Sequence, residues 1–442
     1  MAYNCFRNMS KSRVLVWFRN DLRIHDHVLL HEAAKKNKEI LPVYCFNPLY
    51  YAKSPINTLR TGAFRAKFII ESVRDLRTEF KKKGGSLIVR FGQPEKIIPE
   101  LVESYAINEV IVHQEVAYDE NHEMDLVERE LWKQKIPLTS FIGHTLFHKQ
   151  DLPFPIKDIP DTFTIFRKKI EKESTVRPEY PMPENLSFIP VGDDGEIPDL
   201  IQLGLQEFSI GNEKYLTMEG GEKPALARLQ HYIWNTESIL TYKQTRNNLM
   251  GDTYSSKLSP YLSLGCISPR RIYHEIIRFE NEKYANDSTY WLIFELLWRD
   301  FFRFMFKKHG NRYFLQSGIR KSTPVQFEGE AKRFESWKNA TTPNQLINAF
   351  MKELKATGYL SNRGRQIVAS YLIHDLKVNW TWGAWYFEEY LIDYSPASNW
   401  GNWSYLAGVG NDPKEIRIFN PEIQALKFDP HNNYSDYWNN LM

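Results

Sequence analysis

The sequence predicts a protein of two domains, an N-terminal α/β domain with a parallel, Rossmann-like sheet and an all-α C-terminal domain, joined by a long linker. Three observations predict this architecture. Short apolar runs alternate with helical patterns in the first third of the chain, a proline-rich stretch follows, and the apolar spacing is then helical almost to the end. With 442 residues, 42% of them hydrophobic, the chain is long enough for two sizeable cores.

Residues 13–145 carry the α/β pattern, after a leader of residues 1–12 that has no periodicity and that we expect to be flexible. Four short apolar runs are candidate strands, at residues 14–18, 40–44, 87–89 and 110–112. Helical patterns separate them, such as the one at residues 64–80, which ends at Gly84. Strands that alternate with helices imply right-handed crossovers, so the sheet should be parallel. No GxGxxG follows the first run, which disfavours a nicotinamide site.

Residues 146–205 form the predicted linker. Eight prolines lie between about residues 150 and 205, together with acidic residues and glycines at 192–196. From residue 206 to residue 442 we expect a helical domain, because the apolar residues there recur at helical spacing.

Composition disfavours several classes of protein. Cys5, Cys45 and Cys266 form no CxxC pair, and the twelve histidines show no HExxH spacing, so we expect neither a disulfide framework nor a metal site. The sequence has no run of eighteen apolar residues and no signal-peptide core, so we expect a soluble, cytoplasmic protein, and a monomer. The net charge of +3 decides nothing about nucleic acid, because a basic groove can coexist with balanced charge elsewhere.

Three dense segments in the second half carry the candidate chemistry. Residues 398–405 (SNWGNWSY) hold two indoles and two amides, and Asn399 and Trp403 share a helical face that suits a planar redox ring. Residues 361–366 (SNRGRQ) offer donors for phosphates and carbonyl oxygens, although a solvated basic turn fits them equally. The third segment places four residues on one helical stripe, which are Glu295, Trp298, Arg299 and Phe302. On the residues alone, this stripe could also be an ion pair beneath an indole.

With these segments the sequence resembles the photolyase/cryptochrome superfamily, and most closely its DASH cryptochrome branch. The resemblance runs from about residue 13 to about residue 438, nearly the whole chain. It implies a bent FAD in the helical domain and blue-light repair of cyclobutane pyrimidine dimers by an electron from the excited, reduced flavin. The protein would then supply orientation and electrostatics rather than a general base or a nucleophile.

The resemblance also implies which residues hold the flavin. The loop that cradles the flavin diphosphate is matched by Tyr242, Ser255, Ser256, Lys257, Leu258 and Ser259. An ordinary capped helix would look the same. The other residues matched to the flavin are Glu295, Arg299, Phe302, Asn362, Arg365, Asp393, Ser395 and Asn399. Asn399 matches the residue that faces flavin N5, and Arg365 the partner of Asp393. Ser395 stands where the family usually has a second Asp, so one side-chain acceptor is missing.

DNA contacts follow from the same resemblance. The residues matched to the DNA backbone are Arg246, Lys257 and Arg363. Those matched to the lesion pocket are Glu295, Trp298, Asn362, Gln366 and Tyr405. Tyr405 and Gln366 replace a Trp and a Met that are usual there, and a smaller, more polar pocket offsets less of the few kcal/mol that extrusion from a duplex costs. We therefore expect single-stranded or looped DNA that carries pyrimidine dimers, held by phosphate contacts and stacking.

Electron supply to the flavin should use aromatic rings as stepping stones. Trp403 and Trp380 match the proximal and middle members of the family's tryptophan chain. The outer position is Phe327, and Phe is far harder to oxidise than Trp. Either the chain is broken there or a nearby ring serves instead, the candidates being Trp382, Trp385 and Tyr386.

For an antenna, DASH proteins often carry 5,10-methenyltetrahydrofolate between the domains, and Glu115 is the residue that we match to it. A surface acidic loop is the alternative at this position. Two other functions stay open, a signalling blue-light photoreceptor that binds DNA or a partner without efficient repair, and a flavin-free DNA binder. Signalling cryptochromes often carry a long C-terminal extension, and this chain stops at Met442, which favours repair.

Overall fold

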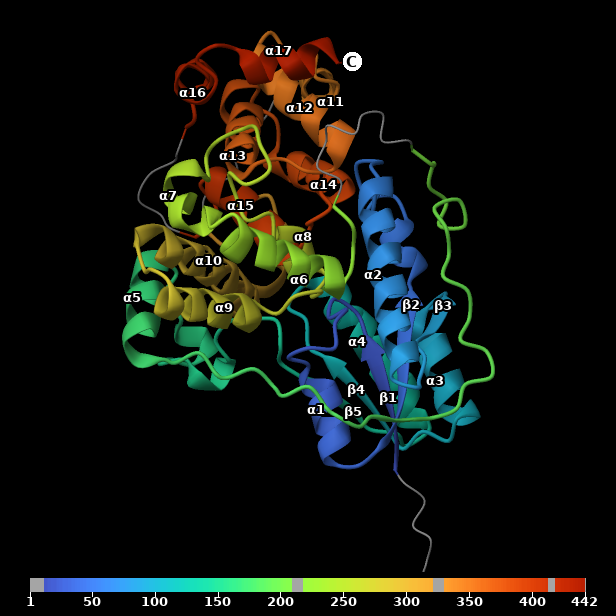
Figure 1. Ribbon diagram of the computed structural model, residues 1–442. Helices are drawn as coiled ribbons and strands as arrows, with labels where there is room; N and C mark the ends of the chain where they lie inside the picture. The colour runs from blue at the N-terminus through green and yellow to red at the C-terminus, as the bar shows by residue number, and fades with distance from the viewer. Residues whose placement is uncertain (1–11, 209–217, 321–329, 412–417, 442) are drawn as a thin grey trace, which may run out of the picture.

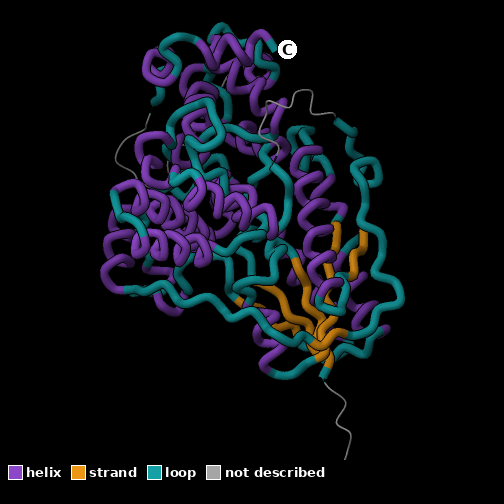
Figure 2. Tube along the Cα trace, in the orientation of Figure 1, coloured by secondary structure: helices purple, strands orange, loops and turns teal. Residues whose placement is uncertain are grey.

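The structure is a computed structural model that describes residues 12–208, 218–320, 330–411 and 418–441. Phe327 and all of the predicted leader except Ser12 lie outside these ranges. The N-terminal part is a sheet flanked by helices, and the C-terminal part is helical (Figure 1). Figure 2 shows the strands gathered at the end of the molecule away from the C-terminus. Both predicted fold classes are confirmed.

The sheet is parallel and has the strand order β3-β2-β1-β4-β5. Its strands are β1 (Arg13–Phe18), β2 (Glu39–Phe46), β3 (Ile88–Phe91), β4 (Glu109–His113) and β5 (Leu138–Phe141), and the short β6 (Ser187–Phe188) pairs with β2. In the register of the central pairs, Val16 lies beside Pro42 and Ile111. The strand order reverses between β1 and β4, and open α/β sheets bind ligands outside the carboxyl ends of the strands at such a point.

Alternating side chains of β1 enter two different cores. The helices around the sheet are α1 (Val28–Lys35), α2 (Ala63–Lys82), α3 (Pro94–Ser104) and α4 (Tyr118–Lys133). Leu15 and Trp17 share a core with residues of α3 and α4. Val14 and Val16 share a core with residues of α1 and α2 that continues into the helical part. One face of the sheet therefore packs within its own domain, and the other joins the domains.

The long helix α10 (Asp287–His309) lies among the other helices of the C-terminal part (Figure 1). The others are α5 (Phe163–Glu173), α6 (Glu222–Gln230), α7 (Tyr242–Thr245), α8 (Ser259–Ser263), α9 (Pro269–Glu282), α11 (Glu330–Lys338), α12 (Gln345–Thr357), α13 (Asn362–Ser370), α14 (Trp380–Tyr390), α15 (Pro396–Leu406), α16 (Pro421–Phe428) and α17 (Asn433–Asn440). Helix α5 lies within residues predicted as linker, and its Phe163 stacks on Trp298 of α10, with ring centroids 3.7 Å apart. In the ranges that the structure describes, no helix is both long enough and apolar enough to cross a membrane.

Buried carboxylates fix the two parts against each other. Asp300 on α10 accepts the backbone N–H groups of Leu146 and Phe147, both at 2.9 Å. Burial raises the pKa of Asp300 to about 7, although these N–H groups act in the opposite direction. Glu222 at the start of α6 accepts the backbone N–H of His25 at 3.1 Å and lies 2.6 Å from its Nδ1. The position of α10 relative to the sheet is therefore set by polar contacts as well as by the shared core.

Candidate functional site

Eight predicted site residues line one cavity of about 90 Å³ in the helical part. They are Asn362, Arg365, Gln366, Asp393, Ser395, Asn399, Trp403 and Tyr405. They come from α13, from the turn before α15, and from α15 itself. Phe387 and Leu391, at the end of α14, complete the apolar part of the wall. Segments more than thirty residues apart in sequence thus meet, because α14 and α13 both pack on α15.

An ion pair in the wall of this cavity leaves acceptor atoms for a ligand. Arg365 Nη2 donates to Asp393 Oδ2 at 2.9 Å, and Arg365 Nε donates to the Leu360 carbonyl at 2.8 Å. Burial lowers the pKa of Arg365, but the Asp393 carboxylate outweighs it, and the pKa lies above its ordinary value. Asp393 Oδ1 and Gln366 Oε1 are buried and have no hydrogen-bond partner in the described part of the chain. Buried acceptors of this kind fit a flat ligand with N–H and O–H groups, as FAD has.

Asn399 is fixed in orientation by the neighbouring helix. Its side chain lies one turn into α15, and the residue is 8% exposed. Nδ2 donates to the Ala384 carbonyl of α14 at 2.9 Å. Trp403, four residues later, lines the same cavity. A side chain held by a second helix can present its carbonyl oxygen to a ligand without reorganising first.

Part of the α10 stripe reaches the mouth of the site. Trp298 stacks on Phe163, and its ring centroid lies 6.4 Å from that of Tyr405, which lines the cavity. Glu295, one turn earlier, forms an ion pair with Arg246. The alternative of an ion pair near an indole is therefore realised, and it lies beside the cavity rather than in a closed core.

The other part of the stripe packs elsewhere. Arg299 donates to the carbonyls of His144 and Leu262, at the junction with the sheet. Burial lowers the pKa of Arg299 to about 9, and the nearby Arg303 adds to this effect. Phe302 packs so closely on α15 that a side chain at Gly401 would collide with it. Both residues pack between elements in this structure, and their contact with the flavin stays a prediction.

The loop before α8 offers one further buried polar atom. Ser255 Oγ is buried, and its neighbour is the Tyr359 hydroxyl. Tyr242 is buried as well, and burial raises its pKa. Lys257 is 7% exposed, its Nζ donates to the Gly251 carbonyl at 3.0 Å, and it lies 4.6 Å from the ring of Tyr254. Burial lowers the pKa of Lys257 to about 8. This inward position favours the role in the flavin loop over contact with a DNA backbone, and both roles stay predictions.

Arg363 is held between aromatic rings. Its guanidinium carbon lies 5.3 Å from the ring centroid of Phe419 and 5.0 Å from that of Phe428. Nε and Nη2 both approach Asn247 Oδ1, at 3.3 and 3.2 Å. Stacking on two aromatic faces orients a guanidinium at little cost in side-chain entropy. Arg363 is therefore a cation in a fixed position on α13. In sequence it lies between Asn362 and Arg365, which line the cavity.

A second cavity of about 370 Å³ lies between the sheet and the helical part. Its aromatic side chains are Trp17, Tyr44, Phe46, Tyr50, Tyr51, Tyr118, Phe314, Trp385 and Tyr394, its cations are Arg19, Arg60, Arg65 and Arg303, and its carboxyl groups are Asp119, Glu120, Glu123 and Glu388. Aromatic walls with polar groups of both charges suit a flat ligand that carries polar edges.

Glu115 is buried behind this second cavity, which excludes the alternative of a surface acidic loop. It accepts from Asn20 Nδ2 at 3.1 Å and from Arg303 Nη2 at 2.7 Å. Burial raises the pKa of Glu115, but His144 and Arg303 outweigh it, so the pKa lies below its ordinary value. Glu120, which shares Asn20 at 3.1 Å, has a raised pKa because of burial and the Glu115 charge. The cavity wall thus combines an ionised carboxylate behind Asn20 with a neutral carboxyl group at its surface.

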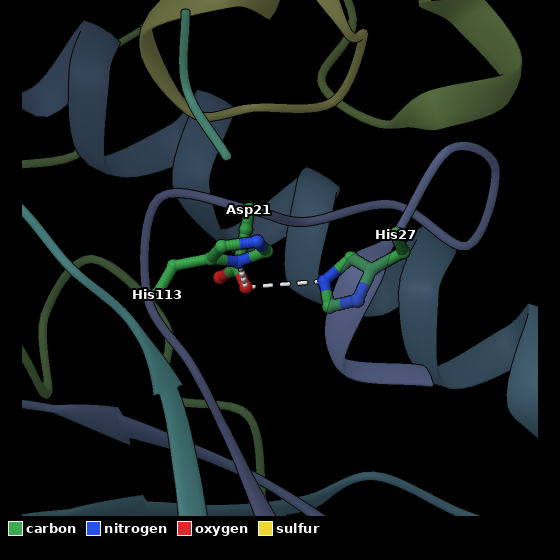
Figure 3. A group of neighbouring side chains, drawn as sticks. All are labelled: Asp21, His27 and His113. Atoms are coloured by element: carbon green, nitrogen blue, oxygen red, sulfur yellow. Dashed lines mark hydrogen bonds and ion pairs between the residues drawn. The ribbon is translucent and has the colours of Figure 1, made fainter. Parts of the chain in front are cut away.

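Sequence reasoning missed a buried cluster between β1 and β4, formed by Asp21, His27 and His113 (Figure 3). Asp21 Oδ2 lies 2.5 Å from His113 Nδ1 and 3.1 Å from His27 Nε2. Asp21 Oδ1 accepts the N–H of Arg19 at 2.7 Å, and His27 Nδ1 accepts that of Leu30 at 3.4 Å. These side chains could ligate a metal, but the hydrogen bonds already satisfy Asp21 and His27, so we assign the cluster a structural role. Asp21 and His27 lie between β1 and α1, whereas His113 ends β4, so no spacing in the sequence could reveal the cluster.

The cluster predicts a pH dependence of stability. Burial lowers the pKa of His27 to about 4, although the Asp21 carboxylate acts in the opposite direction. The unfolded chain therefore binds a proton at about pH 6.5 that the folded chain binds only near pH 4, and stability should fall over this window by roughly 3 kcal/mol.

Urea unfolding at about pH 7 and about pH 4.5 measures this effect. His27→Asn keeps an N-cap acceptor and an amide donor, and this variant should lose less stability on acidification than the parent. An equal loss in the parent, in His27→Asn and in the exposed control His122→Asn would show that His27 does not contribute.

Comparison with known proteins agrees with this geometry. A model of the family DNA photolyase matches residues 14–184, and a model of the FAD binding domain of DNA photolyase matches residues 291–440. Cryptochrome DASH of Gloeobacter violaceus is 46% identical over 97% of this chain and 86% of its own length, and Cryptochrome DASH of Danio rerio is 44% identical over 97% and 84%. The crystal structure of the Synechocystis sp. PCC6803 cryptochrome superposes with a TM-score of 0.93, at 42% identity, over 97% of this chain and 89% of that one.

Proposed function

This chain belongs to the photolyase/cryptochrome superfamily and is of DASH cryptochrome type, and from this we propose that it repairs cyclobutane pyrimidine dimers in single-stranded or looped DNA under blue light. The observation that carries the proposal is the single cavity in which Asn362, Asn399, Trp403 and Tyr405 meet. We also propose that residues 13–145 form the antenna domain, that residues 146–205 link it to residues 206–442, and that the protein is a cytoplasmic monomer.

We propose that FAD is held by residues with buried polar atoms. Asp393 Oδ1 and Gln366 Oε1 would accept hydrogen bonds from it, and Ser255 Oγ would bind its diphosphate. The ion pair with Arg365 holds this carboxylate in place. Asn399 would present its amide oxygen to the reactive edge of the ring. When bound, reduced and excited by light, FAD supplies the electron that splits the dimer and receives it back.

The lesion pocket would be formed by Tyr405, Trp298 and Gln366 around the mouth of the flavin cavity, with Glu295 and Asn362 at its side. Tyr405 and Trp298 offer two aromatic faces whose centroids are 6.4 Å apart at 71°. An edge-to-face pair of this kind gives an extruded dimer one stacking surface rather than two parallel ones. This arrangement supports a preference for lesions that need no extrusion from a duplex.

Repair of one thymine dimer, placed either in a single strand or in a perfect duplex of the same sequence, tests this preference. The single strand should be repaired faster, because the duplex adds a few kcal/mol of unpairing and unstacking. Tyr405→Trp should narrow the difference between the two repair rates, because it enlarges the stacking surface. Equal rates on both substrates for the parent would contradict the proposed preference, and repair of neither would favour a photoreceptor without efficient repair.

DNA binding itself should weaken with salt. Arg363, fixed between Phe419 and Phe428, is the cation that we assign to a phosphate, together with Arg246. Arg363→Gln should weaken binding of an undamaged single strand and reduce the slope of log K against log salt by about 0.7, the value for one phosphate contact on a single strand. The control Arg129→Gln removes an exposed charge on α4 and should leave the slope unchanged. A parent whose binding does not depend on salt would contradict the phosphate assignment.

For the second cavity we propose 5,10-methenyltetrahydrofolate as an antenna. The aromatic walls would hold its pteridine, Asn20 and the neutral Glu120 would face its polar edge, and Glu115 would act from behind by orienting Asn20. Arg65, whose buried Nε has no hydrogen-bond partner in the described part of the chain, offers a partner for its glutamate carboxylates, whereas Arg60 is already paired with Asp119 and Glu388.

A further inference from the structure

Trp403, in the wall of the flavin cavity, touches one oxidisable ring behind it. Trp403 is 2% exposed, and its ring centroid lies 6.4 Å from that of Trp337 on α11. The position of the ring is fixed, because a side chain at Gly383 would collide with it. Trp337 is fully buried, and its Nε1 donates to the Val368 carbonyl at 3.0 Å. Both indoles are therefore held rigidly, with one near the flavin and one farther from it.

Two tyrosines continue this row to the surface. The centroid of Tyr386 lies 5.4 Å from that of Trp337, and the centroid of Tyr390 lies 4.7 Å from that of Tyr386. The tyrosines are one turn apart on α14, so they lie on the same face of the helix. Tyr386 is 1% exposed, whereas Tyr390 is only partly buried. The row thus begins at the flavin cavity and ends at solvent.

Two other aromatic branches are less suitable. The ring of Trp380 contacts that of Trp400, with centroids 5.7 Å apart. The ring of Trp400 in turn contacts that of Trp385, which lines the second cavity. Trp382 is reached through the ring of Phe334, which is hard to oxidise. Only the first of these branches consists of oxidisable rings. It leads from Trp400 of α15 to Trp385 in the second cavity, and not to the surface beside Trp403.

We propose that electrons for reducing the flavin travel along Trp403, Trp337, Tyr386 and Tyr390, and that Tyr390 is the final donor within the protein. This route rests on the proposed flavin site. With FAD bound, oxidised and excited by light, Trp403 would give up one electron to it, and the positive hole would move outward through Trp337 and Tyr386. At Tyr390 the O–H bond breaks, its proton passes to water, and a neutral tyrosyl radical remains. An external thiol then restores the tyrosine by supplying one hydrogen atom.

The hydroxyl groups explain why the hole stops at the outer tyrosine. Burial raises the pKa of Tyr386 and that of Tyr390, so both phenols carry their proton at neutral pH. A neutral phenol is readily oxidised only if its proton can leave. Tyr386 donates to the Lys338 carbonyl at 3.3 Å and also interacts with the Tyr390 hydroxyl, and neither a backbone carbonyl nor a neutral phenol is a strong enough base to keep that proton. Tyr390 reaches solvent, where water can accept it.

The test is electron paramagnetic resonance of the illuminated protein with oxidised FAD, in the parent and in Tyr390→Phe, Tyr386→Phe and Trp337→Phe. Protein grown on ring-deuterated tyrosine identifies the radical without any substitution, since deuterium narrows a tyrosyl signal and leaves a tryptophanyl signal unchanged. We expect a tyrosyl radical in the parent. It should be lost in all three variants and kept in the control Tyr284→Phe, which removes an exposed tyrosine outside the row. Trp380→Phe tests the other branch. Flavin absorbance and thermal unfolding of each variant report on folding.

Three results would overturn the route. A parent signal that deuterated tyrosine leaves unchanged would exclude a tyrosyl donor. A signal that survives in Tyr390→Phe but is lost in Trp380→Phe would assign the electron supply to the other branch. A parent that holds FAD and forms no protein radical would exclude both branches, while light-dependent repair by the chemically reduced protein would leave the proposed function intact. A parent that binds no FAD would overturn the proposed function and the route together.

Discussion

Asn399→Asp should abolish light-driven accumulation of reduced flavin and lower the amount of flavin that the purified protein retains. In the parent, Nδ2 donates to the Ala384 carbonyl at 2.9 Å in a site that is 8% exposed. A carboxylate has no N–H to offer there, so its oxygen would face a carbonyl oxygen, and we expect the free energy of unfolding to fall by about 2 kcal/mol. A negative charge beside the ring also opposes its reduction.

The matched control for this change is Asn402→Asp. Asn402 lines the same cavity, but it is exposed and donates to the Ser398 carbonyl of its own helix at 2.8 Å. The control should therefore keep most of its stability and its flavin. Flavin absorbance, the rate of reduction under blue light with a thiol, and urea unfolding measure the three effects. Parental behaviour of Asn399→Asp in all three would remove Asn399 from its proposed position beside the flavin.

Arg365→Met should release the flavin and destabilise the fold. The substitution leaves the Asp393 carboxylate, whose side chain is 3% exposed, without its ion-pair partner. Breaking a buried pair in this way costs about 3 kcal/mol, taking the low end of the usual range because the Arg365 side chain is 24% exposed. Stability should be measured by urea unfolding, and flavin retention by absorbance after gel filtration.

A double variant separates the charge from the loss of packing. Arg365→Met with Asp393→Asn removes both charges, so stability should recover relative to Arg365→Met alone, and the interaction energy follows from the double-mutant cycle. Flavin retention should stay low, because the carboxylate that we assign to the ligand is gone. If Arg365→Met alone retained parental flavin and parental stability, the ion pair would have no part in the site.

Much of the fold could be predicted because local patterns carry it. The four apolar runs fall on β1 to β4, and the helical pattern at 64–80 falls on α2. The strand β5 (Leu138–Phe141) could not be found in this way, since its sequence LTSF has no apolar run. Helix α5 was hidden in the predicted linker by the prolines around it. Its stability comes from packing on α10, which no local pattern reveals.

The site residues that could be predicted are those whose neighbours in sequence are also their neighbours in the cavity. Asn399, Trp403 and Tyr405 lie on one short helix, so a dense motif marks them. The direction of Lys257 and the partners of Arg299 depend on contacts with distant segments. Trp337 stands outside the three dense segments, and its place behind Trp403 follows from the packing of α11 near α15.

Light-dependent repair is the direct test of the proposed photochemistry. Chemically reduced protein is mixed with a single-stranded oligonucleotide that carries one thymine dimer, and loss of the dimer is compared under blue light and in darkness. We predict repair in light and none in darkness, because the electron comes from the excited, reduced flavin in the cavity lined by Asn399. Protein that holds reduced FAD and repairs the dimer in neither condition would contradict the proposed repair activity. The alternative function, a photoreceptor without efficient repair, would then be favoured.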